Sequence, residues 1–182
     1  MLAALALLVP LALSPAAVAP SPAVPAALQE QRKDEKRPDY AHLNVDKQGL
    51  ALSGYDPVAY FPEGGGKPAK GDAKITLTQG GVTWRFASEE HRKLFEASPK
   101  KYEPAYGGWC AWAMASGDKV EVDPTSFLIE EGRLQVYYDS FFADTRKKWL
   151  KETGAVLRPK ADAAWKKIVE PPKPPPDADK GK

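Results

Sequence analysis

The sequence predicts a single α+β domain, a small antiparallel sheet of hairpins with short helices packed on it. Short runs of alternating apolar and polar residues are separated by glycine-containing turns, which is typical of antiparallel hairpins. Helical segments follow the hairpins instead of joining successive strands, which favours α+β over a parallel α/β sheet. The 5 Trp, 7 Tyr and 6 Phe residues all lie between Tyr40 and Trp165. That segment suffices for one core, and we place the domain at residues 40–169.

The first predicted pair of strands is a hairpin with a two-residue turn. Apolar residues alternate with polar ones in residues 74–79 and again in residues 82–86. Gly80 and Gly81 lie between the two runs. Two consecutive glycines supply the positive backbone dihedral angles that tight hairpin turns require, so we expect the strands to pair directly.

A helix is predicted to begin directly after this hairpin. Ser88 can cap the free amides at the helix start, and two glutamates follow it in the first turn. Leu94 and Phe95 then lie on one face until Pro99 ends the helix. His91 therefore belongs to the first turn of this helix.

Further strands are predicted in the second half of the domain. Val120 and Val122 alternate with polar residues, and residues 127–129 and 134–138 form two more apolar runs. The turn Glu131-Gly132 joins these last two runs. We expect all these strands to pair in an antiparallel manner.

Two helices are predicted to follow as a C-terminal helical extension of the domain. Ser140 can cap the first of them, which would continue through Trp149 to a stop at Gly154. Residues 161–169 predict a shorter helix around Trp165.

The amino-terminal residues 1–23 predict an export signal. Residues 2–19 form an apolar run, and residues 17–19 and 21–23 each offer a small-x-small cleavage site. The run lacks a basic start, so an uncleaved membrane anchor is the alternative. We expect an exported protein, periplasmic or secreted, with N-terminal membrane anchoring as the other reading.

The segments that flank the domain are rich in proline and charge. Residues 24–39 predict a Pro/Ala-rich and charged linker, and residues 170–182 predict a disordered Pro/Lys tail. Neither shows the apolar periodicity of a helix or a strand. The composition of both favours extended chain that builds no core.

Charge composition narrows the class of partner. The chain has 26 Lys and Arg and 24 Asp and Glu, for a formal net charge of +2. The two signs are interspersed and form no basic stripe, so we expect no nucleic-acid partner. All charges follow residue 29, which excludes a multi-pass membrane protein and leaves membrane contact only through an uncleaved N-terminal segment.

Four segments, which follow one another in the same order as in the family, resemble the YHS-domain family in its bacterial exported branch. They read GYDPVAYF at residues 54–61, WRFASEEHRKLF at 84–95, SPKKY at 98–102 and YGGWCA at 106–111. The resemblance covers roughly residues 50–138 and implies a small domain from a family associated with metal handling. Many members carry cysteines in Asp-Pro-Val-Cys and Phe-Cys-Ser-x-x-Cys segments. Here Ala59, Ala87 and His91 stand at those positions, so the implied ligand set does not carry over.

Three side chains are candidates for a soft-metal site. His91, Cys110 and Met114 offer imidazole, thiolate and thioether groups that suit copper, as Cu(I), or zinc. Cys110 and Met114 would share one face if residues 108–115 were helical. The alternative is an inert core, because Cys and Met are commonly buried for packing alone. Cys110 is the only cysteine, so no intrachain disulfide can form.

His91 also has an interpretation without metal. It can form a hydrogen bond with Tyr102, Tyr106 or Asp56 and so tie the 54–61 loop to the helix. No cysteine-protease motif surrounds Cys110, and we expect no enzyme activity from a Cys/His pair.

The aromatic segment around the two adjacent glycines predicts a ligand pocket. Glycines let the backbone approach closely, and large rings cluster beside them. The alternative is that these rings form the main core of the domain. The candidate pocket residues are Tyr55, Asp56, Tyr106, Gly107, Gly108, Trp109 and Trp112.

The sequence thus predicts an exported YHS-like binding module rather than an enzyme. It would bind a transition metal or a small ligand around His91, Cys110 and Trp109. The alternative is an interaction module without metal, which docks on another cell-envelope protein through the aromatic segment and the Pro-rich tail.

Overall fold

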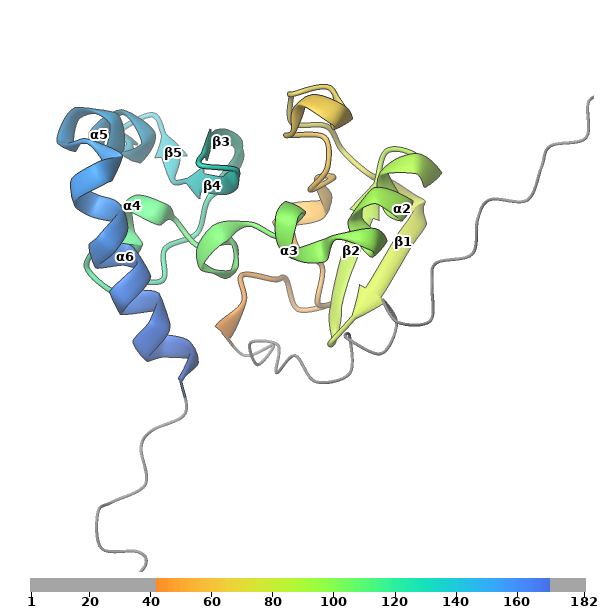
Figure 1. Ribbon diagram of the computed structural model, residues 1–182, viewed down its shortest axis with the longest axis horizontal. Helices are drawn as coiled ribbons and strands as arrows, with labels where there is room; N and C mark the ends of the chain where they lie inside the picture. Colours follow the sequence, from red (N-terminus) through yellow and green to blue (C-terminus); the bar gives the residue numbers. More distant parts are fainter. Residues whose placement is uncertain (1–41, 171–182) are drawn as a thin grey trace, which may run out of the picture. The chain divides into compact units, whose positions relative to one another are not determined.

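The computed structural model describes residues 42–170 (Figure 1). They belong to one compact unit, Arg37–Lys182. The export signal or anchor predicted at 1–23, the linker predicted at 24–39 and, apart from Glu170, the tail predicted at 170–182 lie outside the described residues. Within residues 42–170, no helix is both long and apolar enough to cross a membrane.

The predicted α+β class is confirmed. The described chain forms two-stranded antiparallel sheets and short helices, and no sheet among residues 42–170 has a third strand. The pairs are β1 (Asp72–Gln79) with β2 (Val82–Phe86), β3 (Asp123–Glu130) with β4 (Arg133–Tyr137), and β5 (Asp139–Ser140) with β6 (Ala143–Asp144).

The first hairpin and its helix are as predicted. Gln79 pairs with Val82 across the two-glycine turn, and both glycines have positive φ. The Ser88 hydroxyl accepts the His91 amide at 3.2 Å and caps helix α2 (Glu89–Ala97). Pro99 ends α2 and begins the short helix α3 (Pro99–Tyr102).

Short 3-10 turns precede β1, and another 3-10 turn and a short helix lie between α3 and β3. The turns are η2 (Leu52–Gly54), η3 (Pro62–Gly64) and η4 (Ala105–Gly108). Helix α4 (Ala111–Met114) follows η4, with Cys110 as its N-cap residue. The helix is shorter than the residues 108–115 that the sequence suggested.

The second hairpin differs from the prediction at its start. Glu131 and Gly132 form the predicted turn, both with positive φ. Val120 and Val122 precede β3 and form no strand, because the Val120 carbonyl accepts the Cys110 amide at 3.0 Å instead.

Ser140 does not cap a helix, which corrects the prediction. Its hydroxyl accepts the amides of Phe142 and Ala143, both at 3.3 Å, and closes the β5–β6 turn. The cap is Asp144, whose carboxylate accepts the Lys147 amide at 2.9 Å and begins α5 (Thr145–Glu152). A charged carboxylate facing the positive helix start satisfies the amides better than a hydroxyl four residues earlier.

The last helix is longer than predicted. Helix α6 (Gly154–Val169) includes Pro159, which the sequence placed ahead of the helix. Pro159 lies in the second turn, where the missing N–H removes one helix hydrogen bond without ending the helix.

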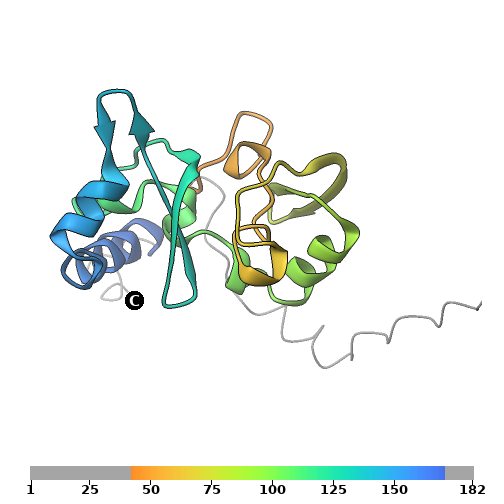
Figure 2. The same cartoon turned by 90° about the horizontal axis from the view of Figure 1, so that it is seen from above.

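The buried apolar residues form two cores. The first core is built mainly from the 51–61 segment, β2, α2 and α3. The second core is built mainly from η4, α4, α5 and α6. Strand β4 serves both: Leu134 and Val136 belong to the first core and Tyr137 to the second. Figure 2 shows β4 between the elements of the two cores.

Candidate ligand cavity

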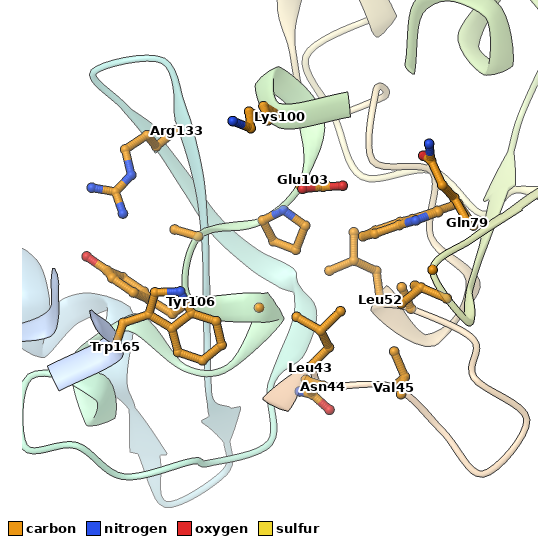
Figure 3. A pocket seen from close by; sticks show the side chains of 17 residues that line it. Leu43, Asn44, Val45, Leu52, Gln79, Lys100, Glu103, Tyr106, Arg133 and Trp165 are labelled. Carbon is orange, nitrogen blue, oxygen red and sulfur yellow. The ribbon is translucent and has the colours of Figure 1, made fainter. Parts of the chain in front are cut away.

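A cavity of about 330 Å³ lies between the two cores. Its walls come from segments far apart in the sequence, which meet only in the folded chain (Figure 3). Leu52, Val82 and Trp84 contribute from the first core, and Tyr106 and Trp165 contribute from the second. The walls are therefore mainly apolar, as in most small-molecule sites.

The backbone beside the cavity is strained at two places that are not glycine. Tyr106 has φ 56° and Leu52 has φ 48°, and both residues line the cavity. A left-handed backbone costs an L-residue roughly 1–2 kcal/mol, and such strain clusters at binding sites.

Gly107 allows the closest approach of the chain to Trp165. It has φ 62°, and a Cβ built there would lie 2.7 Å from the Trp165 ring and 2.8 Å from a Leu43 methyl. Only glycine fits this position without moving the cavity walls.

An ion pair holds the Tyr106 end of the cavity. The Tyr106 hydroxyl donates to Asp162 at 3.0 Å, and two Arg133 nitrogens donate to the same carboxylate at 2.9 and 3.2 Å. The Arg133 guanidinium lies 5.2 Å from the centre of the Tyr106 ring. Burial raises the pKa of Tyr106 above its ordinary value, so the hydroxyl stays a neutral donor at physiological pH.

Gln79 supplies an unpaired acceptor on the opposite side of the cavity (Figure 3). Its Oε1 is buried and has no hydrogen-bond partner among the described residues. A buried carbonyl oxygen without a donor is costly, and a bound donor group would relieve that cost.

Asp56 and His91 form a separate polar cluster under the 54–61 loop. Asp56 is fully buried and accepts the amides of Val58 and Ala87, both at 2.8 Å. His91 Nδ1 lies 2.5 Å from the second carboxylate oxygen. An ionised carboxylate only accepts, so Nδ1 carries the hydrogen. Of the three partners predicted for His91, the structure selects Asp56, and the bond ties the loop to α2 as predicted.

The three candidate metal ligands have separate surroundings. His91 contacts Asp56, whereas Cys110 is fully buried with its Sγ 3.3 Å from Thr145 Oγ1 and 3.4 Å from the Tyr138 amide. Met114 is buried in the second core. Residues 42–170 contain no group of three or more His, Cys, Asp or Glu side chains placed to hold a metal ion.

Only some of the predicted pocket residues line the cavity. Tyr106 and Gly107 line the cavity, and Gly108 lines a smaller polar hollow beside it. Trp109 donates to the His42 carbonyl at 2.7 Å, and Trp112 donates to Glu152 at 3.2 Å. Both rings pack against the second core instead of lining the cavity.

The remaining two predicted pocket residues lie in the 54–61 loop. Asp56 is bound to His91, and the ring of Tyr55 lies under Lys70, 4.0 Å from its ammonium nitrogen. Neither lines the cavity.

Sequence reasoning missed most of the cavity wall. Leu43 and Val45 precede the first predicted element, and Trp165 lies in the last helix. No local pattern shows that these residues meet. The glycine pair at 107 and 108 was the one available signal, and it marked the correct segment.

Comparisons with protein-family models, with curated proteins and with solved structures found no match to this chain.

Proposed function

We propose that this chain is a YHS-like binding module that holds a small, largely apolar ligand in the cavity between its two cores. The preferred ligand is a flat aromatic or alicyclic molecule with one hydrogen-bond donor. The export predicted from residues 1–23 belongs to the same proposal and would make the ligand an extracytoplasmic one.

The observation that carries the proposal is the cavity itself. Its volume of about 330 Å³ lies at the lower end of the range for small-molecule sites, and its walls combine apolar side chains from both cores with polar ones such as Gln79, Glu103 and Arg133. The hollow is partly open to solvent, so a ligand can enter it from the surface.

The polar groups support one orientation of the ligand. The Tyr106 hydroxyl is already bonded to Asp162, so that end offers ring contacts. Among the residues that line the cavity, only Gln79 has a buried side-chain acceptor without a hydrogen-bond partner in the described chain. A donor on the ligand would face Gln79, and its ring would lie toward Tyr106 and Trp165.

Metal binding stays a prediction based on His91, Cys110 and Met114. The Asp56–His91 bond favours it, because metal-ligating histidines commonly donate their other nitrogen to a carboxylate, whereas the separate surroundings of the three side chains count against a shared site. Competition titration with Cu(I) and Zn(II) measures the metal affinity and stoichiometry of the wild type, His91→Ala and Cys110→Ala. Stoichiometric binding lost in both variants would support a metal module.

Calorimetric titration with 1-naphthol tests the cavity. We expect a single site, and we expect Ala105→Leu, which adds volume to a residue of the cavity wall, to weaken binding by about tenfold or more. Ala97→Leu makes the same change at an exposed position at the end of α2 and should leave binding unchanged. Equal binding by Ala105→Leu and wild type would contradict the proposal.

The role of Gln79 is tested by a matched pair of probes. 1-Naphthol carries a donor and 1-methoxynaphthalene does not. The wild type should prefer 1-naphthol, and Gln79→Leu should reduce that preference by about tenfold without loss of folding stability, because it removes an unpaired acceptor. An unchanged preference would rule out Gln79 as the recognition group.

A further inference from the structure

The β5–β6 hairpin exposes two adjacent phenylalanines. Phe141 is 96% exposed and Phe142 is 93% exposed, and they are the most exposed large apolar residues in the described chain. Their rings contact each other edge to face, with centroids 5.2 Å apart. Figure 2 shows the hairpin projecting beyond helices α5 and α6.

The turn geometry does not require these residues. The two central positions of a hairpin turn are usually Gly, Asn or Asp, because those residues suit its backbone. Here Ser140 closes the turn through two hydrogen bonds, and the two Phe side chains contact only each other among the ring pairs of the described residues. Two exposed rings at such a tip indicate a function outside the fold.

The base of the hairpin is held firmly to the second core. The Thr145 amide and hydroxyl both donate to the Tyr138 carbonyl, at 3.0 and 2.8 Å. The buried Cys110 sulfur contacts the Thr145 hydroxyl and accepts the Tyr138 amide. This gives the buried cysteine a positioning role: it fixes the hairpin on the body of the domain.

Basic side chains follow the tip directly. Helix α5 carries Arg146, Lys147, Lys148 and Lys151, and its only acidic residue is Glu152 at the far end. Asp139 and Asp144 oppose each other at the hairpin base, and Asp144 is paired with Lys147 at 3.2 Å. Residues 139–152 thus carry four basic and three acidic side chains, and the three lysines on α5 are exposed.

We propose that this hairpin is a membrane-docking element, in which Phe141 and Phe142 enter the interface of an anionic phospholipid bilayer. Aromatic rings are favoured at the level of the lipid headgroups, and basic residues beside them are attracted to anionic lipids. The basic residues of α5 make a bilayer a better fit than an uncharged protein surface. This docking is independent of ligand binding in the cavity.

Depth-dependent quenching tests the insertion directly in the full chain. Phe142→Trp places a fluorophore at the tip, and vesicles of phosphatidylcholine and phosphatidylglycerol with brominated acyl chains quench indoles that enter the bilayer. Leu94→Trp is the control, because Leu94 is an exposed apolar residue on α2, away from the hairpin. We expect at least roughly twofold stronger quenching of the added fluorophore at 142 than at 94.

This readout reports the position of the tip even if residues 2–19 bind the same vesicles. Equal quenching at 142 and 94 would overturn the proposal. Phe141→Ser/Phe142→Ser should also lower the partition onto these vesicles, and added salt should lower it for the wild type by screening α5.

Sedimentation velocity without vesicles distinguishes membrane docking from self-association, in which the two rings would contact a second copy of this chain. If Phe141→Ser/Phe142→Ser converts an oligomer to a monomer and Phe142→Trp is not quenched, the two rings form an interface between copies of the chain, and the membrane proposal fails.

Discussion

The Asp56 cluster and the cavity differ in how well their polar groups are satisfied. Both Asp56 oxygens are occupied, by the amides of Val58 and Ala87 and by His91. In the cavity wall, Gln79 Oε1 has no partner in the described chain, and Tyr106 has a strained backbone.

This difference separates groups that hold the fold from groups available to a ligand. A buried carboxylate whose two oxygens are both bonded within the fold stabilises one conformation and has no oxygen left for a second molecule. A cavity with an unpaired acceptor and strained walls lowers stability unless something occupies it.

Asp56→Ala should have the largest effect on stability. It leaves the buried Val58 amide and the part-buried Ala87 amide without an acceptor and removes the partner of His91, which should lower the free energy of unfolding by roughly 3 kcal/mol. Denaturant unfolding measures it, with the exposed Asp46→Ala as the control. Asp46 also accepts two local amides, at 2.8 and 2.9 Å, but water can replace it, so we expect a loss of about 1 kcal/mol or less. Equal losses would show that burial of the Asp56 cluster contributes nothing.

Gly107→Ala should have a smaller effect on stability and a specific effect on the cavity. The new Cβ meets Trp165 and Leu43 in addition to the left-handed backbone cost, for a loss of about 2–3 kcal/mol. Gly132→Ala is the matched control, since Gly132 has φ 75° and nothing lies within 4 Å of the added Cβ. The control should lose about 1 kcal/mol and keep naphthol binding. The account fails here if Gly107→Ala binds 1-naphthol as tightly as Gly132→Ala.

The smallest predicted effect is on acid stability through Glu63. The hydrogen bond from Lys101 is the main cause that lowers the Glu63 pKa from its ordinary value of 4.5 to about 2, and Tyr102 adds a hydrogen bond of 2.9 Å. A carboxylate whose pKa is lower in the folded state stabilises the fold above the unfolded pKa, and this contribution disappears as the pH falls from about 4.5 to about 2. Because Glu63 is partly exposed, we expect less than about 1 kcal/mol.

Unfolding measured from pH 7 to pH 2 checks the Glu63 prediction. Glu63→Gln should lose less stability over this range than the wild type, and Tyr102→Phe should be intermediate. Superimposable pH profiles for the wild type and Glu63→Gln would exclude the Glu63 contact as a source of acid sensitivity.

Local signals predicted the parts of the fold that local contacts determine. The Gly80-Gly81 turn and the Ser88 cap act within a few residues, and both formed as expected. Ser140 was misassigned because a serine hydroxyl accepts amides in a hairpin turn as readily as at a helix start: it bonds Phe142 and Ala143, and Asp144 caps α5 through the Lys147 amide. The His91 partner was among the three considered, but only the fold could select Asp56.

The cavity could be predicted only in part. Tyr106 and Gly107 were identified because two adjacent glycines beside large rings are a local signal. Leu43, Gln79 and Trp165 join them only after the two cores pack against β4, and no sequence pattern encodes that contact. Trp109 and Trp112 seemed equivalent in the sequence, yet their ring N–H groups are bonded to His42 and Glu152 away from the cavity.

The most direct test of the central claim is an NMR measurement of intermolecular contacts between 1-naphthol and the methyl groups of the protein. The account predicts nuclear Overhauser effects from the probe to Leu43, Leu52 and Val82, which line the cavity. Contacts only to exposed methyl groups away from the cavity, such as those of Leu150 and Val156, or to no methyl group at all, would contradict ligand binding between the two cores.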